Sequence, residues 1–257
     1  MKKIALILGA SEGLGYASAE ALVKEDVYVC IVSRNQEKLN SAVDKLNTIC
    51  RDHAISFTGD LSDSDLIRNA INLVSSKWGS INILVNSNGG PKAGKVSNLS
   101  DQDWIDSFNS YALPVFRAIR EVLPEMKKQK WGRIITIGSI AAFEPIENLD
   151  ISNFIRSGFL GLHKSLAREV ACDQVNVHVV LPGAIYTGRT QGRIEQRAIK
   201  LNISKEESMS MSIAKIPKNK IGDPMDVGNL VAFLCSEKAD YLTGSSHNVD
   251  GGMSVSI

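Results

Sequence analysis

The apolar run Ile4–Leu8 (IALIL) leads directly into Gly9–Gly15 (GASEGLG), and a stretch with helical patterning follows. Three glycines within seven residues permit a tight turn and a close approach of the backbone to a ligand. Where such a turn joins a strand to a helix, the free N–H groups at the helix N-terminus face the ligand and favour phosphate. An ordinary strand-to-helix loop is the alternative for three glycines considered alone. In this context Gly9–Gly15 predicts the turn that holds the pyrophosphate of a nicotinamide dinucleotide.

Short β-rich runs alternate with longer amphipathic stretches along the rest of the chain. All but the last run are largely apolar throughout, which is typical of parallel strands covered on both faces. The pattern therefore predicts an α/β fold, namely a Rossmann-type doubly wound parallel sheet of about seven strands in three α/β/α layers. Asn35, Ser62 and Ser100 are expected to cap helices. The expected strands are Ile4–Leu8, Val27–Val32, Ala54–Phe57, Ile81–Val85, Ile134–Ile137, Val175–Leu181 and Ser246–Val249.

The organisation predicted for residues 1–257 is a single dinucleotide-binding oxidoreductase domain. One charged, helix-rich region, Thr187–Lys220, interrupts the alternation between two sheet elements. It is either a surface excursion or, as its place beyond the carboxyl ends of the strands favours, a lid over a substrate pocket. Its basic and acidic residues are mixed, so its composition favours no substrate class.

Composition limits the possible partners. The 257 residues carry a formal net charge of +1, with 44% hydrophobic and 22% charged residues. Such a balance does not favour nucleic acid or an anionic membrane as a partner, and no apolar run reaches the ~20 residues needed to cross a bilayer. The four cysteines form no CxxC pair and the four histidines lie far apart in the sequence. We therefore expect a cytoplasmic protein with no metal site.

The end of the second expected strand indicates which dinucleotide is bound. Ser33 and Arg34 stand there, with Arg34 25 residues after Gly9. An acidic residue at this place would accept hydrogen bonds from the ribose hydroxyls of NAD, whereas Arg suits the 2′-phosphate of NADP. NADP is therefore favoured, with NAD as the alternative, because the Glu12 carboxylate would repel a 2′-phosphate. A solvated loop position is the alternative for Arg34.

Further motifs follow the third to sixth strands. Asp60-Leu61 follows the third strand, Asn86-Ser87-Asn88-Gly89 follows the fourth, and Pro182–Thr187 (PGAIYT) follows the sixth. In their types and order these motifs resemble those of the short-chain dehydrogenase/reductase superfamily, over essentially the whole chain. The nearest resemblance is to 3-oxoacyl-[acyl-carrier-protein] reductase-like members. It implies cofactor contacts from Gly9, Ser11, Glu12, Gly13, Leu14, Gly15, Ser33, Arg34, Asp60, Leu61, Asn86, Ser87, Asn88, Gly89, Arg156, Pro182, Gly183, Ile185 and Thr187.

The resemblance is weakest at the catalytic positions. In the superfamily a Tyr transfers the proton, a Lys four residues later lowers the Tyr pKa, a Ser polarises the carbonyl and an Asn supports a water relay. Ser139 stands at the serine position, but the Tyr and Lys positions fall on Ser152 and Arg156, and the Asn position falls on Tyr111. No Tyr or Lys occurs in residues 140–163. The pattern Ser152-Asn153-x-x-x-Arg156 is similar to that of a divergent set of reductase-like members.

Three functional interpretations follow for the four candidate catalytic residues, Ser139, Tyr111, Ser152 and Arg156. The protein is an NADP(H)-dependent oxidoreductase of a small-molecule carbonyl or alcohol, with Tyr111 as the proton donor near Arg156. Alternatively, water supplies the proton and turnover is slow. In the third interpretation the protein binds the dinucleotide as a sensor or scaffold without catalysis, and Tyr111 is a packed aromatic. Broad apolar helix faces predict a homodimer or homotetramer.

Overall fold

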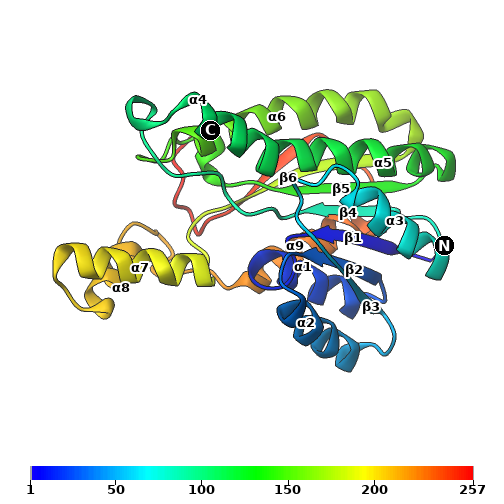
Figure 1. Ribbon diagram of the computed structural model, residues 1–257, viewed down its shortest axis with the longest axis horizontal. Coiled ribbons are helices and arrows are strands. Elements are labelled where there is room, and N and C mark those ends of the chain that lie inside the picture. The colour runs from blue at the N-terminus through cyan, green and yellow to red at the C-terminus, as the bar shows by residue number, and fades with distance from the viewer. Residues whose placement is uncertain (1, 257) are drawn as a thin grey trace.

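The computed structural model describes residues 2–256 and contains one seven-stranded parallel sheet in the order β3-β2-β1-β4-β5-β6-β7 (Figure 1). This order reverses direction between β1 and β4, the topological switch point where α/β proteins bind ligands. The doubly wound fold expected from the sequence is confirmed. The strands are β1 (Ile4–Leu8), β2 (Tyr28–Ser33), β3 (Ala54–Thr58), β4 (Ile83–Asn86), β5 (Gly132–Ile137), β6 (Val175–Pro182) and β7 (Ser245–Val249).

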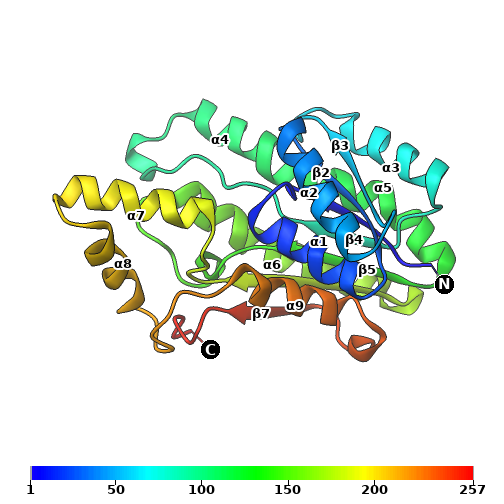
Figure 2. The same cartoon turned by 90° about the horizontal axis from the view of Figure 1, so that it is seen from below.

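Helices cover both faces of the sheet, and alternation along β1 shows why (Figures 1 and 2). Ala5 and Ile7 enter one core with side chains of α1 (Gly13–Lys24), α2 (Gln36–Ile49) and α9 (Pro224–Leu234). Leu6 and Leu8 enter the other core, because successive strand side chains point to opposite faces. That second core contains side chains of α3 (Leu66–Lys77), α5 (Leu113–Gln129) and α6 (Asp150–Val170).

Short helical segments complete the connections. A π-helical turn, η2, joins α4 to α5 and contains Tyr111. Turns of this kind are rare and often occur at functional sites. The segments are α4 (Asp101–Ser107), η1 (Val96–Asn98), η2 (Phe108–Ala112), η3 (Ile140–Ala142), η4 (Ala171–Asp173) and η5 (Glu237–Ala239).

Two of the three predicted helix caps are confirmed. The side chains of Asn35 and Ser100 accept hydrogen bonds from the first turns of α2 and α4. The prediction for Ser62 is wrong. The Asp60 carboxylate accepts hydrogen bonds from both the N–H and the hydroxyl of Ser62, each at 2.8 Å, and this turn delays the start of α3 until Leu66.

The segment of residues 187–220 contains α7 (Gly188–Leu201) and α8 (Lys205–Ile213), which lie against each other and extend from the sheet as a projection (Figures 1 and 2). We call it the lid segment, after the role that the sequence predicts for it. It follows β6 after a short loop and therefore stands at the carboxyl edge of the sheet, where the loops after β1, β4 and β5 also lie. No helix among residues 2–256 is long and apolar enough to span a membrane.

Candidate active site

The glycine turn has the backbone geometry that a phosphate cradle needs. Gly9 has a φ of +68°, and a Cβ at this position would overlap with the carbonyl oxygen of Ser87. A Cβ on Gly15 would in turn overlap with the carbonyl oxygen of Gly9. No side chain caps α1, whose first residue is Gly13. The first-turn N–H groups are therefore available to a phosphate, and these residues fit a dinucleotide pyrophosphate.

The loop after β4 lies beside this turn. The Asn88 amide nitrogen donates to the carbonyl oxygen of Tyr111 at 3.1 Å, whereas its buried Oδ1 has no hydrogen-bond partner within residues 2–256. Gly89 borders open space, because a Cβ built on it would meet nothing within 4 Å. On the opposite side, a Cβ on Gly13 would lie 3.8 Å from Thr187. The β1, β4 and β6 loops therefore lie together at this edge of the sheet, and one buried polar acceptor there, Asn88 Oδ1, is unused.

The region predicted to hold the adenosine contains more positive charge than the sequence pattern indicated. The hydroxyl groups of Ser11 and Ser33 lie 3.0 Å apart. Arg34 is exposed and lies 3.8 Å from the Asp60 carboxylate, which helps to lower the Asp60 pKa, although hydrogen bonds from Ser62 contribute more.

The Glu12 carboxylate in this region accepts a hydrogen bond from the Lys38 ammonium at 2.9 Å. This ion pair offsets the negative charge that would repel a 2′-phosphate. Lys38 was not identified from the sequence. Its place in the first turn of α2, after the Asn35 cap, is the signal that would have found it.

A pocket of about 180 Å³ lies at the same edge of the sheet, beside the first turn of α1. It brings together Ser139, Ser152 and Arg156 with the predicted cofactor residues of the β1 and β6 loops. Tyr111 is not among its lining residues. The pocket is lined by Leu14, Gly138, Ser139, Ile140, Ala141, Ile146, Leu149, Ser152, Arg156, Pro182, Gly183, Ala184, Ile185, Thr187, Arg189, Thr190, Arg193 and Met253.

The two serines of the pocket are oriented by fixed donors. Ser139 follows β5, and its Oγ accepts a hydrogen bond from the Ala141 N–H at 3.2 Å. Ser152 lies on α6, and its Oγ accepts a hydrogen bond from Nε of Arg156 at 2.8 Å. Arg156 also donates through Nη1 to the Gly138 carbonyl oxygen. Because each serine oxygen already accepts, its hydroxyl hydrogen is free to donate to a ligand oxygen.

Tyr111 lies behind the pocket wall. Its side chain is only 3% exposed, and its hydroxyl has no hydrogen-bond partner within residues 2–256. The Arg156 guanidinium lies 5.3 Å from the ring centroid. Burial raises the pKa of Tyr111, while the charges of Arg156 and Arg189 oppose that shift. The structure thus places Tyr111 near the cation that the sequence argument invoked, but not at the pocket surface.

A series of buried, hydrogen-bonded polar side chains connects the elements that carry the site. Asn86 donates to the Thr136 hydroxyl at 3.1 Å, and that hydroxyl lies 2.7 Å from Nε2 of His163. Nδ1 of His163 lies 2.8 Å from the Phe159 carbonyl oxygen, so Nδ1 carries the proton and Nε2 accepts. Burial lowers the pKa of His163 to about 4. His163 is therefore a neutral structural residue that ties α6 to β5 and β4.

Two lining residues from the lid segment, Arg189 and Arg193, were not proposed as site residues from the sequence. Both lie in the first turns of α7, directly after Thr187. A Cβ on Gly90 would overlap with the Arg189 guanidinium, so the Arg189 side chain reaches the β4 loop. Their four-residue spacing, which places them on one helix face, is the signal that would have found them.

One further cluster lies away from the pocket. Ligand atoms of Asp26, Cys50 and His53 lie within 4.8 Å of one another, in a part of the chain where no metal site was expected. Both ring nitrogens of His53 already have protein partners, with Nε2 2.9 Å from the Asp26 carboxylate and Nδ1 2.9 Å from the Arg51 carbonyl oxygen. Tyr28 stacks on the ring at 4.0 Å. These contacts account for the cluster without an ion.

Comparison with known proteins shows the family. A model of the enoyl-(acyl carrier protein) reductase family matches residues 9–254. The chain is 32% identical over 252 residues to a 3-oxoacyl-[acyl-carrier-protein] reductase of Buchnera aphidicola, covering 98% of this chain and 97% of that protein. It is also 32% identical over 253 residues to the Vibrio harveyi reductase of the same name, with 98% and 97% covered.

Two solved structures match the fold over its whole length. The structure of L-sorbose reductase from Gluconobacter frateurii, complexed with NADPH and L-sorbose, has a TM-score of 0.95 at 27% identity, with 100% of this chain and 98% of that one covered. YwfH, an NADPH-dependent reductase involved in bacilysin biosynthesis, has a TM-score of 0.94 at 26% identity, with 100% of both chains covered. By its sequence, its sheet order and its glycine turn, the chain belongs to the short-chain dehydrogenase/reductase superfamily.

Proposed function

We propose that this protein is an NADP(H)-dependent oxidoreductase that interconverts a carbonyl and an alcohol through an atypical site in a 3-oxoacyl-[acyl-carrier-protein] reductase-like framework. One observation carries the proposal. Ser139, Ser152 and Arg156 line the same pocket as the cofactor segment Pro182–Thr187. A reactive carbonyl there would lie between the hydroxyl donors and the place where the superfamily holds the nicotinamide.

The bound cofactor would supply or accept a hydride, and the chain would manage the charge on the substrate oxygen. Ser139 and Ser152 donate hydrogen bonds to that oxygen through their free hydroxyl hydrogens. Arg156 polarises Ser152 through the hydrogen bond from its Nε. Preorganised donors of this kind stabilise a developing oxyanion without reorganisation. Arg156 and Ser152 thus stand, in this proposal, where relatives have the Lys and the Tyr.

Tyr111 is the proposed proton donor. Its hydroxyl is buried near Arg156 and has no competing partner among the described residues. Because Tyr111 does not line the pocket, its proton must reach the substrate through a water molecule or a side-chain movement. The alternative is that water itself protonates the product near Ser139.

NADP is the proposed form of the cofactor. Arg34, Ser33 and Ser11 lie together at the adenosine end, and Lys38 neutralises Glu12. Two structural relatives add support, because YwfH is described as an NADPH-dependent reductase and L-sorbose reductase was solved in complex with NADPH. We expect Arg34→Ala to raise the Kd of NADPH roughly 10-fold and to leave that of NADH nearly unchanged, as for loss of a charge-assisted hydrogen bond. An unchanged NADPH/NADH preference would remove Arg34 from the site.

A non-catalytic sensor or scaffold is the second candidate. The observation that favours it is the chemistry of the pocket lining, which offers Ser, Thr and Arg but no group whose ordinary pKa lies near neutrality. Fluorescence titration with NADPH, followed by NADPH oxidation assays with aldehydes, ketones and 3-oxoacyl thioesters, separates the two. Tight binding with turnover supports the oxidoreductase, whereas binding without turnover from pH 5 to 9 supports the sensor.

Three organisational features complete the proposal. Residues 1–257 act as a single domain, residues 187–220 form the substrate lid, and the protein works in the cytoplasm as a homodimer or homotetramer. The position of the lid segment beside the pocket supports the second of these, because Arg189, Thr190 and Arg193 contribute to the lining.

A further inference from the structure

Three guanidinium groups share the active-site pocket. Arg156 comes from α6, and Arg189 and Arg193 come from the first turns of α7. The lining residues include no Asp, Glu or Lys, so these three side chains give the pocket its whole formal charge. Within residues 2–256, none of the three forms an ion pair with a carboxylate. The pocket is therefore strongly positive in a protein whose overall net charge is only +1.

Most of the hydrogen-bond donors of these arginines are unused. A guanidinium has five N–H groups, and Arg156 uses one on Ser152 and one on Gly138. Arg193 makes one long hydrogen bond, at 3.4 Å, to the Thr190 hydroxyl. The Arg189 guanidinium, which lies over Gly90, has no hydrogen-bond partner in the described part of the chain. Nearly all of this donor capacity remains for a ligand.

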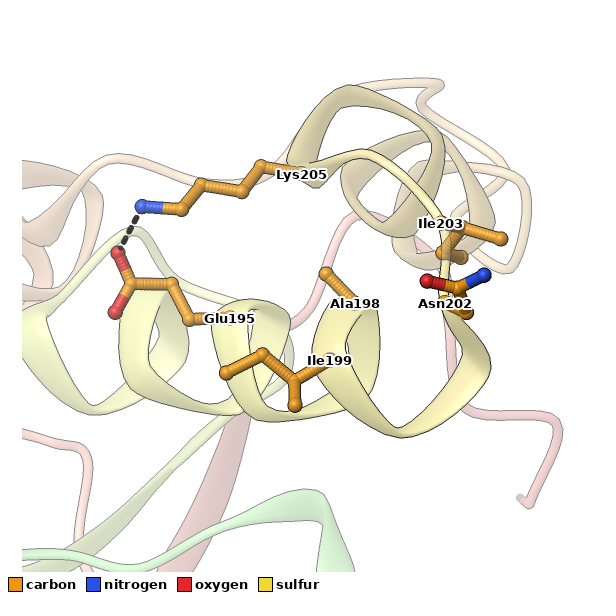
Figure 3. A pocket seen from close by; sticks show the side chains of 6 residues that line it. All are labelled: Glu195, Ala198, Ile199, Asn202, Ile203 and Lys205. Atoms are coloured by element: carbon orange, nitrogen blue, oxygen red, sulfur yellow. Dashed lines mark hydrogen bonds and ion pairs between the residues drawn. The ribbon is translucent and has the colours of Figure 1, made fainter.

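None of the three lid-segment carboxylates lines the pocket, and Glu195 and Glu207 have partners elsewhere. Figure 3 shows Glu195 directed toward Lys205 across the gap between α7 and α8, where the two form an ion pair of 2.6 Å. Glu207 accepts hydrogen bonds from the backbone N–H and the hydroxyl of Ser204 at the start of α8. The mixed charge of this segment in the sequence is thus separated in space, with free arginines at the pocket and paired acids away from it.

Arg189 and Arg193 are exposed as whole residues, but partial burial of their guanidinium groups beside like charges still affects their pKa values. Burial lowers the pKa of Arg189, and the charge of Arg156 lowers it further. The pKa of Arg193 is lowered in the same way, by burial first and then by Arg189 and Arg156. An anion bound among the three groups would relieve this repulsion. A neutral ligand would leave it in place.

We propose that the substrate carries an oxyanion group, a carboxylate or a phosphate, which Arg189 and Arg193 bind while Arg156 and the two serines hold the reacting carbonyl. This inference rests on the proposed function, and it narrows the substrate class from any carbonyl compound to an anionic one. The pyrophosphate of the cofactor is assigned to the uncapped N-terminus of α1, so these arginines are left for the substrate. The planar guanidinium fork suits bidentate binding of both oxyanions.

Binding to the complex with NADP⁺ tests the proposal without requiring turnover. The probes are benzoate and phenyl phosphate, with methyl benzoate as the neutral counterpart, titrated by calorimetry. The variants are Arg189→Gln and Arg193→Gln, with Arg193→Lys to restore the charge without the fork. Lys200→Gln is the matched control, because Lys200 is an exposed α7 residue outside the pocket lining and its substitution changes the net charge equally.

We expect an oxyanion probe to bind more tightly than methyl benzoate, and Arg189→Gln or Arg193→Gln to weaken that binding at least 10-fold. Lys200→Gln should change it less than 2-fold, and Arg193→Lys should recover part of the loss. Preference for benzoate identifies a carboxylate substrate, and preference for phenyl phosphate identifies a phosphate ester. Equal binding of charged and neutral probes would overturn the proposal.

The NADPH affinity of the same variants separates the possible failures. If Arg189→Gln and Arg193→Gln weaken NADPH binding and leave probe binding intact, the arginines bind the cofactor and the proposal is wrong. If the unmodified protein binds NADPH but no oxyanion probe, only the substrate class is refuted. If it fails to bind NADPH at all, the proposed function itself fails.

Discussion

Replacing Tyr111 with Phe tests two roles of one hydroxyl group at once. The hydroxyl is buried without a partner among residues 2–256, and an unsatisfied buried polar group costs about 1–3 kcal/mol. Phe keeps the ring, its packing at 5.7 Å from Phe159 and its face toward Arg156 at 5.3 Å. Tyr111→Phe should therefore raise the free energy of unfolding by about 1 kcal/mol, taking the lower end of that range.

The same variant should lose activity. A positioned general acid contributes about 10²–10⁴-fold to a rate, so we expect kcat to fall by at least 100-fold while the Kd of NADPH stays the same. Urea denaturation at fixed pH measures the stability change from the shift of the midpoint at constant slope. Tyr28→Phe is the matched control, because Tyr28 is half-buried on His53 and is not a pocket residue.

The two measurements refute different parts of the reasoning. A stabilised variant with full activity would show that Tyr111 is a packed aromatic and that the proton comes from water. A variant destabilised by 1 kcal/mol or more would show that the hydroxyl has a partner, and the argument from an unpaired group would be wrong. A stabilised and inactive variant is the result that the proton-donor role requires.

Three further outcomes are expected. Gly9→Ala should destabilise the fold by more than about 2 kcal/mol and abolish NADPH binding, since a positive φ costs a non-glycine residue about 1–2 kcal/mol and the Cβ meets Ser87; unchanged fluorescence titration would contradict this. The low His163 pKa, about 4, means that the unfolded chain binds more protons between pH 6.5 and 4. Stability should thus fall as pH falls through that window, by about 2 kcal/mol from pH 7 to pH 5, and His163→Asn should remove that part of the slope in urea titrations. Because burial raises the pKa of Tyr111 above its usual value, kcat should be nearly independent of pH from 6 to 9, whereas an ionisation near 7 would reveal a different proton donor.

The features predicted most accurately are those that depend on residues adjacent in the sequence. All seven strands lie within two residues of their expected ends, because continuous apolar runs between turn residues have few other stable arrangements. The glycine turn was predictable because Gly9 and Gly15 satisfy backbone requirements that no side chain meets. The prediction that Ser62 caps a helix was wrong because it depends on more than residue type. The competing hydrogen bonds from Ser62 to Asp60 depend on loop geometry, which residue type alone does not give.

The functional site was predictable where a motif occupies a fixed place on the sheet edge. Ser139, Ser152 and Arg156 meet in one pocket because β5 and α6 are adjacent in the fold. The depth of Tyr111 was not predictable, since it depends on the π-helical turn that precedes α5. The direction in which Arg189 points was not predictable either, because it depends on how the lid segment packs on the β4 loop.

If Arg156 stands where relatives have a Lys, as we propose, the pocket performs a different kind of chemistry. A Lys beside a Tyr tunes a proton donor, whereas a guanidinium bonded to Ser152 and to the Gly138 carbonyl is a fixed positive charge that cannot take part in proton transfer. Such a site stabilises negative charge on a substrate oxygen and leaves protonation to a distant group or to water. Arg189 and Arg193 add to the positive potential of the pocket, which would repel cations and attract anions. The proposed catalytic roles of Ser152 and Arg156 therefore agree with the proposed anion-binding role of Arg189 and Arg193, and together they predict a pocket selective for an anionic carbonyl compound.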